Sequence, residues 1–229
     1  MKKHNFINLP ILMVVFLAFT MGCGKDEDGE NSITYEYYTD PRDGETYKTL
    51  KIGEQVWMAE NLRYLPGLVE PDSASQTIPL YYVLAYQGDN VTEAKATEYY
   101  QTYGALYNWT AAKIACPAGW HLPTEAEWMQ LADFVGGAST AGEKLKESGT
   151  EHWGVINDNI TDGYGFRALP GGCCLADGLF DGLGNFGTWW TINEVDSTGA
   201  SYILMTDNTG VYTGRSIKEH GFSVRCIKD

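Results

Sequence analysis

The stretch from Cys116 to Gly137 constrains the fold most strongly, because it contains the clearest helix signal in the chain. Thr124, with Glu127 three residues later, predicts a capping box, in which each side chain satisfies a backbone N–H at the helix start. An apolar stripe follows at i, i+3, i+4 and i+7, made of Trp128, Leu131, Ala132 and Val135. The two glycines after Val135 can adopt the left-handed conformation that ends a helix. The sequence therefore predicts one amphipathic helix that must bury this stripe.

Two segments N-terminal to this helix also show regular patterns. Residues 46–62 are rich in Tyr, Thr, Ile, Val and Trp, and they predict two short strands that turn at Gly53. Residues 102–115 predict a second helix, with apolar residues at helical spacing and Pro117 as its stop. Two neighbouring helices need a surface to pack against, and the remaining segments offer strands.

The other segments are shorter and richer in turns. Residues 63–102 predict a long irregular loop with one strand at 81–86, and residues 143–148 predict a short helical piece. The last third predicts an antiparallel meander over residues 165–170, 186–192, 201–207, 210–217 and 221–229. The predicted fold class is therefore α+β, with two helices on a twisted, mostly antiparallel sheet that places the N-terminal and C-terminal strands side by side.

Residues 1–22 have the pattern of an export signal. A basic start precedes a nearly continuous apolar run from Phe6 to Thr20, which is shorter than the roughly 20 residues of a membrane span. Gly22 before Cys23 resembles a bacterial lipobox, in which the cysteine is acylated and becomes the mature N-terminus. A plain signal peptide that is cleaved elsewhere, with Cys23 uninvolved, is the alternative. An acyl chain on Cys23 would hold the protein at the lipid bilayer.

Residues 23–38 are polar and acidic at their start, and they predict a solvated tether ahead of a domain over residues 39–229. The Lys25-Asp-Glu sequence resembles the lipoprotein export signal of Bacteroidetes. That resemblance implies an outer-membrane lipoprotein exposed on the cell surface. A charged run that serves only as a linker is the alternative.

Charge and size limit the class of partner. The chain has 229 residues and a formal net charge of −14, with 44% hydrophobic residues. This length and composition suit one domain with a buried core behind a leader. Because an acidic surface repels phosphate groups, no nucleic-acid partner is expected.

Four cysteines remain after Cys23, and they allow three disulfide pairings. Export places them where disulfides persist. We favour a bridge between Cys116 and Cys226, because it would join the predicted helix 102–115 to the last strand. For adjacent Cys173 and Cys174 a strained bridge and a redox pair stay open, but two buried thiols are the simpler interpretation.

Several blocks of this sequence, taken in order, resemble the Fibrobacter succinogenes major paralogous domain of Bacteroidetes and Fibrobacteres lipoproteins. The blocks are DGETYKTLKIGEQVWMAENL, YGALYNWTAAKIACPAGWHLPTEAEW, GGASTAGEKLKESGTEHW, GFRALPGG, WWT and GFSVRC. The resemblance runs from about Asp40 to Asp229 and implies a C-type-lectin-like fold. It also implies the Cys116–Cys226 bridge and a ligand-binding loop region between Gly163 and Gly210. The family implies no particular activity.

The stretch HLPTEAEW, residues 121–128, also resembles the matching helix of the formylglycine-generating enzymes, which would imply an oxidase. Copper oxidation in those enzymes requires a pair of late thiolates, whereas Cys226 is the only late cysteine here. The familiar catalytic motifs, such as GxSxG and HExxH, do not occur in the sequence. No catalysis is therefore expected.

No metal or cofactor is expected either. The histidines are scattered, and His121, between Trp120 and Leu122, is interpreted as a packed or capping residue. A structural calcium ion stays open, because hard oxygens occur in turn-rich loops at Asp158, Asp162, Asp177, Asp181 and Asn185. Asp and Asn beside Gly are, however, ordinary turn formers.

The remaining hypothesis is a recognition surface in the last third of the chain. Aromatic and amide side chains there could provide rigid contact area and adaptable hydrogen bonds. The binding candidates are Trp189, Trp190, Asn193, Tyr202, Asn208, Tyr212 and Arg215. Strand alternation would bury one tryptophan of the pair. The expected function is a binding module for an extracellular glycan or protein. The alternatives are an enzyme of the formylglycine-generating branch and a variable target protein of a diversity-generating retroelement.

Overall fold

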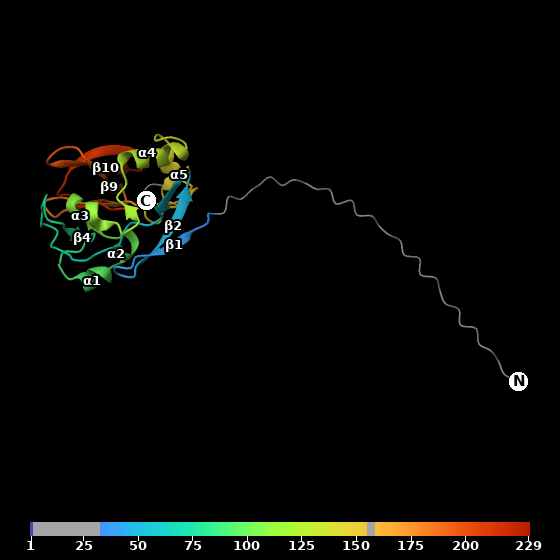
Figure 1. Cartoon of the computed structure of the whole chain (residues 1–229), viewed down its shortest axis with the longest axis horizontal. Helices are drawn as coiled ribbons and strands as arrows, with labels where there is room; N and C mark the ends of the chain where they lie inside the picture. Colours follow the sequence, from blue (N-terminus) through green and yellow to red (C-terminus); the bar gives the residue numbers. More distant parts are fainter. Residues whose placement is uncertain (2–32, 155–158) are drawn as a thin grey trace. The chain divides into compact units, whose positions relative to one another are not determined.

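A computed structural model describes Met1 and residues 33–154 and 159–229 of the chain (Figure 1). The chain divides into two units, Met1–Ser32 and the compact unit Ile33–Asp229. The predictions for the leader 1–22, for Cys23 and for the start of the tether therefore lie outside the described residues. Among the described residues, no helix combines the length and the apolar character that a membrane crossing requires.

The first sheet joins both ends of the compact unit in the order β1-β2-β3-β12-β6. Its strands are β1 (Glu36–Thr39), β2 (Thr46–Ile52), β3 (Gln55–Met58), β12 (Ile227–Lys228) and β6 (Trp120–His121). The hairpin β2–β3 turns where the sequence predicts, since Ile52 pairs with Gln55 across Gly53 and Glu54. Strand β12 pairs with β3, which confirms that the N-terminal and C-terminal strands are neighbours. Strand β1 begins inside the segment 23–38, so the last residues of the predicted tether are part of the sheet.

The second sheet has the order β11-β10-β9-β7-β8. Its strands are β11 (Tyr212–Ile217), β10 (Gly199–Met205), β9 (Gly187–Glu194), β7 (Gly171–Cys174) and β8 (Phe180–Leu183). All pairs are antiparallel except β7 with β9. The predicted strands at 186–192, 201–207 and 210–217 are therefore confirmed.

Two strand predictions in this region are wrong. Residues 165–170 form no named strand, because Gly165 at φ 70° and Arg167 at φ 53° interrupt the extended backbone. The last strand is shortened to β12 because Phe222 and Ser223 bond to separate partners. The N–H of Phe222 donates to the carbonyl of Tyr107, whereas the N–H of Ser223 donates to that of Thr188.

A two-stranded sheet, β4 (Tyr81–Tyr82) with β5 (Leu106–Tyr107), divides the helix predicted over residues 102–115. The helices around it are α1 (Val91–Lys95), α2 (Glu98–Tyr103) and α3 (Trp109–Ala115). Helix α2 ends at Gly104, whose φ is 78° and whose position a Cβ could not occupy, because it would lie 2.7 Å from the carbonyl oxygen of Leu62. Helices α1 and α2 also correct the prediction of an irregular loop over residues 63–102.

Helix α4 (Glu125–Phe134) confirms the amphipathic helix that the sequence predicts after Thr124. Thr124 and Glu127 form the reciprocal capping box, and the predicted stripe from Trp128 to Val135 is buried. Helix α5 (Ala141–Leu145) follows close to the predicted short helical piece. The chain therefore places α4 as its local rules dictate, with the stripe packed on β9 and β10.

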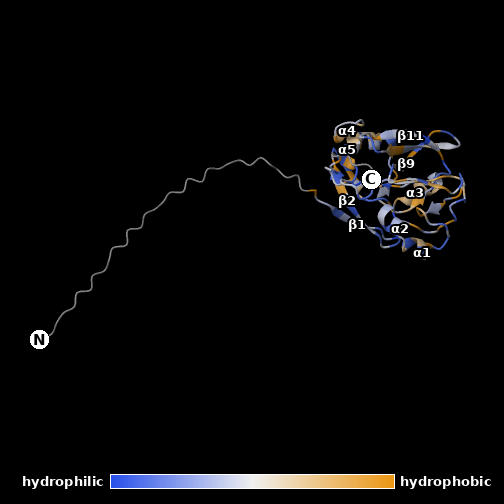
Figure 2. Ribbon diagram, turned by 180° about the vertical axis from the view of Figure 1, so that it is seen from behind, coloured by the Kyte–Doolittle hydropathy of each residue, from blue (hydrophilic) through white to orange (hydrophobic). Residues whose placement is uncertain are grey.

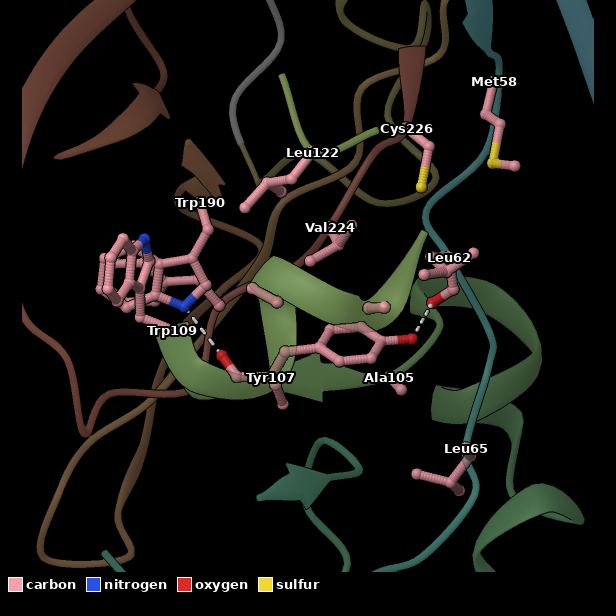
Figure 3. Close-up of a cluster of buried hydrophobic side chains, with 14 of the residues drawn as sticks. Met58, Leu62, Leu65, Ala105, Tyr107, Trp109, Leu122, Trp190, Val224 and Cys226 are labelled. Carbon is pink, nitrogen blue, oxygen red and sulfur yellow. Dashed lines mark hydrogen bonds between the residues drawn. The ribbon is translucent and has the colours of Figure 1, made fainter. Parts of the chain in front are cut away.

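Strand β9 is buried on both faces, and it separates two aromatic clusters. Trp189 packs with Trp128, at 5.9 Å between ring centroids, whereas Trp190 packs with Phe222 at 4.4 Å. Figure 3 shows the second cluster, in which the indole N–H of Trp190 donates to the carbonyl of Tyr107 at 2.8 Å. In Figure 2, hydrophobic (orange) segments lie among the packed elements of the compact unit, whereas β1 at its edge is hydrophilic (blue). The core is thus built on both sides of one strand.

The disulfide between Cys116 and Cys226 is present and confirms the favoured pairing. Cys116 is the C-cap of α3 and Cys226 immediately precedes β12, so the bridge joins helix to sheet over a separation of 110 residues. Cys173 and Cys174 are buried free thiols, as expected. Burial raises the pKa of Cys173 to about 11 and that of Cys174 to about 12.

Candidate functional site

The structure removes the two tryptophans from the predicted binding surface. Trp189 and Trp190 are both 0% exposed, although strand alternation predicts that one of them faces outward. The physical reason is the position of β9, because core clusters cover both faces of this strand. Neither indole can contact a ligand at the surface.

The other predicted binding residues are spread over separate structural tasks. The Asn193 side chain accepts a hydrogen bond from the backbone N–H of Glu125, at the start of α4. Half-buried Tyr202 packs on Phe222, and the backbone carbonyl of Asn208 accepts a hydrogen bond from Lys146.

Besides Asn208, which is exposed in the turn between β10 and β11, Tyr212 and Arg215 on the edge strand β11 combine exposure with a side chain that a ligand could contact. Tyr212 is 44% exposed, and Arg215 is paired with Asp196 in the turn between β9 and β10. Neither residue lines the hollows described below. The predicted set therefore does not form one site.

Two adjoining hollows beside α2 form what we call the trough. The inner hollow has a volume of about 220 Å³ and the outer one about 340 Å³. They share a wall made of Glu98, Thr102, Glu151 and His152. Arg63, Arg167 and Arg225 also line the inner hollow, whereas Tyr99 and Tyr103 line the outer one. The trough therefore combines both signs of charge with tyrosine rings.

Distant segments of the chain supply these residues. Helix α2 carries Glu98 and Tyr99, because the side chain of Thr97 caps its start by accepting the backbone N–H of Tyr100. Buried Asn61 ties the segment after β3 to α2, since its side-chain NH₂ donates to the carbonyl of Tyr103 at 3.0 Å. The left-handed backbone of Arg167 contributes the opposite wall. These segments are distant in sequence, and tertiary packing alone brings them together.

The floor of the trough is the buried guanidinium of Arg225, which is 1% exposed. Its Nη2 donates to the side-chain oxygen of Asn61 at 2.9 Å, and its Nη1 donates to the carbonyl of Phe166. The guanidinium also lies 4.3 Å from the centroid of the Phe166 ring, within the range of a cation–π contact. Burial lowers the pKa of Arg225 to about 9, so the side chain stays charged at neutral pH.

The other two arginines are neutralised by glutamates of the protein. Arg63 Nε lies 3.0 Å from Glu45, and Arg167 Nε lies 2.8 Å from Glu147. Burial opposes the charge of each arginine, but the hydrogen bonds to these carboxylates outweigh it and raise both pKa values. The wall of the trough thus carries polar donors whose charge is already balanced.

His152 stands between the two hollows in a defined orientation. Its Nδ1 lies 2.6 Å from Glu147, and its ring meets the Tyr103 ring edge-on at 5.7 Å between centroids. Glu147, Glu151 and His152 could together offer three ligand atoms to a metal ion. However, Glu147 already contacts His152 with one oxygen and Arg167 with the other, so its carboxylate is occupied.

Two of the residues considered as calcium ligands, Asp162 and Asp177, act as turn formers, whereas Asp181 lies in strand β8. The side chain of Asp162 accepts the backbone N–H of Arg167, and that of Asp177 accepts the backbone N–H of Leu179. Asp158 lies outside the described residues. The other histidine of interest, His121, bonds to Glu127 of the capping box and to the side chain of Asp229.

Two carboxylates and one ring of the trough remain available. Within the part of the chain that the structure describes, the side chains of Glu98 and Glu151 have no hydrogen bond or ion pair. Tyr99 is 39% exposed and stacks on Tyr103, at 6.5 Å between centroids and 24° between planes. The trough can therefore accept hydrogen bonds and offer an aromatic face.

Residues 50–228 match the Fibrobacter succinogenes major domain. The chain belongs to this family. The match covers the second sheet, the disulfide and every residue that lines the trough, whereas β1 and the start of β2 lie before it. The trough is therefore a feature of the Fibrobacter succinogenes major domain in this chain. Neither a curated protein nor a solved structure matches the chain.

The residues of the trough were not singled out by the sequence. Glu98, Tyr99 and Thr102 lie in a segment predicted to be an irregular loop, and Arg167 lies in a predicted strand. One local signal was present, since Thr97 precedes the helix-compatible run EYYQTY and can act as an N-cap. The pattern could have indicated α2, but not its position beside Glu151 and His152.

Proposed function

We propose that the chain is a lipid-anchored protein of the outer membrane, exposed at the cell surface. The basic and apolar leader, the Gly22-Cys23 pair and the acidic residues that follow support an acylated Cys23 with a tether. We also propose that the α+β domain is a C-type-lectin-like fold. The helix-to-strand disulfide and the adjacent first and last strands support this assignment.

Within this setting, the domain is proposed to be a binding module for a glycan or a protein, without a catalytic step or a resident cofactor. The observation that carries the proposal is the trough itself, where Glu98 and Glu151, which have no ion pair among the described residues, stand beside the exposed ring of Tyr99. Exposed polar and aromatic groups that converge on a hollow are typical of recognition sites. The proposed binding site is therefore the trough, and not the β9–β11 region that was predicted from the sequence.

The test is an array of glycans and bacterial surface proteins, probed with the full chain. We expect a ligand whose signal falls when Glu98→Gln and Glu151→Gln are combined, because these substitutions remove the free carboxylate charges. The matched control is Glu36→Gln combined with Glu54→Gln, which changes the net charge equally at exposed positions outside the trough. A ligand that responds to the control pair and not to the trough pair would contradict the proposed site.

The proposed location at the cell surface is tested separately. Protease treatment of intact cells is expected to remove the domain, and Cys23→Ser is expected to release the protein from the membrane fraction. Protein that survives proteolysis in intact cells but not in lysed cells would contradict surface exposure. The oxidase alternative gains no support from the cysteines, since thiols with pKa values of about 11 and 12 hold little thiolate at neutral pH.

A further inference from the structure

We infer that the ligand of the trough is a neutral oligosaccharide of at least two sugar units. This inference rests on the proposed binding function and narrows it to one chemical class. It follows from three properties of the trough: its mixture of hydrogen-bond donors and acceptors, its charge balance, and its division into a polar and an aromatic hollow.

The inner hollow offers donors and acceptors side by side. Arg167 uses only its Nε on Glu147, so its two Nη nitrogens have no hydrogen bond to the residues that the structure describes. Glu98 and Glu151 supply carboxylate oxygens in the same hollow. A sugar hydroxyl both donates and accepts a hydrogen bond, so neighbouring hydroxyls match such an alternation. A purely apolar ligand would leave these groups unpaired, at a cost in binding.

The charges of the trough disfavour an acidic ligand. Arg63 and Arg167 are already paired with Glu45 and Glu147, so they attract an anion only weakly. Glu98 and Glu151 are unpaired among the described residues, and the whole chain carries a formal charge of −14. Uronic acids, sialic acids and sulfated sugars would therefore meet like charge.

A basic peptide is disfavoured by the opposite wall. The guanidinium of Arg225 forms the floor of the inner hollow, and its hydrogen-bond partners among the described residues are amide and carbonyl oxygens, with no carboxylate. A lysine or arginine of a partner protein that entered this hollow would approach the guanidinium of Arg225. Because both signs of charge line the hollow, a neutral ligand avoids repulsion from either wall.

The outer hollow supplies the second subsite. Tyr99 and Tyr103 are four residues apart on α2, and both rings line this hollow. Tyr103 is only 7% exposed, whereas Tyr99 is 39% exposed and can receive a flat apolar surface. The C–H face of a pyranose ring provides such a surface, while its hydroxyls stay solvated. One sugar unit is assigned to the inner hollow and the next one to Tyr99.

The test is calorimetric titration of the full chain with neutral tetrasaccharides of glucose, mannose, xylose and galactose. Their monosaccharides and tetragalacturonate serve as comparators. We expect at least one neutral tetrasaccharide to bind about ten-fold more tightly than its monosaccharide, because only the longer ligand reaches Tyr99. Tetragalacturonate is expected to bind more weakly than that neutral tetrasaccharide.

Tyr99→Ala is expected to weaken this binding about ten-fold, while Tyr37→Ala leaves it unchanged. Tyr37 is the matched control, because it is a tyrosine that is 69% exposed on β1, outside the trough. Circular dichroism melting of both variants verifies that each remains folded. Equal affinity for monosaccharide and tetrasaccharide, tighter binding of tetragalacturonate, or no effect of Tyr99→Ala would each overturn the inference.

The outcomes also separate this inference from the proposed function. A surface protein whose array signal depends on Glu98 and Glu151, together with no binding of any neutral tetrasaccharide, overturns the sugar assignment and leaves the binding function intact. If the combined trough substitutions change the signal of no ligand on the array, the proposed function fails with it.

Discussion

The β9–β11 region and the trough differ in how their side chains are employed. Around β9 the large aromatic residues belong to the core, since Trp189 and Trp190 are fully buried. The exposed Arg215 of this region is paired with Asp196. In the trough the aromatic Tyr99 is exposed and the polar residues Glu98 and Glu151 are unpaired among the described residues.

This difference shows that residue type alone does not mark a recognition surface. The amino acids that are frequent in binding sites are also the ones that fill a core, so their accessibility decides between the two roles. Strand β9 is central and covered on both faces, whereas α2 is a short helix at the rim of a hollow. The trough is therefore the better candidate for a recognition site. Matched substitutions in the two regions test this difference.

The largest contrast is expected between the two arginines. Arg225→Met should lower the free energy of unfolding by about 3–5 kcal/mol, because it leaves the oxygens of Asn61 and Phe166 buried without their donor. Arg215→Met should cost at most about 1 kcal/mol, because its pair with Asp196 is exposed. Urea unfolding measures both. Equal effects would show that Arg225 does not support the floor of the trough.

The next largest effect is expected from removal of the Cys116–Cys226 disulfide, which anchors the chain directly before β12. Replacing Cys116 and Cys226 together by alanine should lower the free energy of unfolding by about 2–5 kcal/mol, since the bridge closes a long loop. Cys173→Ala, which breaks no bridge, serves as the comparison. We expect the double variant to have the lower urea midpoint. A higher midpoint than that of Cys173→Ala would contradict the structural role of the bridge.

Trp190→Phe tests the assignment of β9 to the core. It should lower the free energy of unfolding by about 2 kcal/mol, because it leaves a cavity and removes the hydrogen bond to Tyr107. Tyr212→Phe, on the exposed edge strand, should change it by less than about 0.5 kcal/mol. Thermal and urea unfolding compare the two. A larger effect of Tyr212→Phe on the free energy of unfolding would contradict the assignment of Trp190 to the core.

The smallest contrast is in the pH dependence of two aspartates. Burial raises the pKa of Asp162, behind the trough, to about 6 from an ordinary 3.8. The stability that this group contributes is therefore complete below pH 4 and is lost as the pH rises towards 6. Asp162→Asn should thus raise the urea midpoint at pH 7 and leave it unchanged at pH 3.

Asp196 should behave in the opposite way. Hydrogen bonds from Thr198 lower its pKa to about 2, so its contribution is present above pH 4 and is lost as the pH falls towards 2. Asp196→Asn should therefore lower the urea midpoint at pH 7 and leave it unchanged at pH 2. The same sign for both variants at pH 7 would contradict the difference between the two environments.

Local sequence signals predicted the parts of the fold that are themselves local. The capping box from Thr124 to Glu127 and the hairpin around Gly53 were predicted because a few neighbouring residues determine each of them. The Cys116–Cys226 bridge was favoured among three possible pairings because it would join the predicted helix 102–115 to the last strand. The α+β class followed from the same signals.

The trough could not be predicted, because its residues meet only through tertiary packing. Gly104 ends α2 against the backbone of Leu62, and Arg167 adopts a positive φ that its sequence does not indicate. The burial of both tryptophans of β9 likewise depends on which elements cover each face of the strand. Sequence periodicity describes one element at a time and does not contain this information.

The most direct test of the account is to map ligand contact on the full chain by amide chemical shifts, using the tetrasaccharide or surface protein that the assays above identify. We expect the shifted amides to cluster at residues 98–103 and 151–152 and at Arg167. Shifts that cluster instead at Tyr212 to Arg215, with those of α2 unchanged, would contradict the assignment of recognition to the trough.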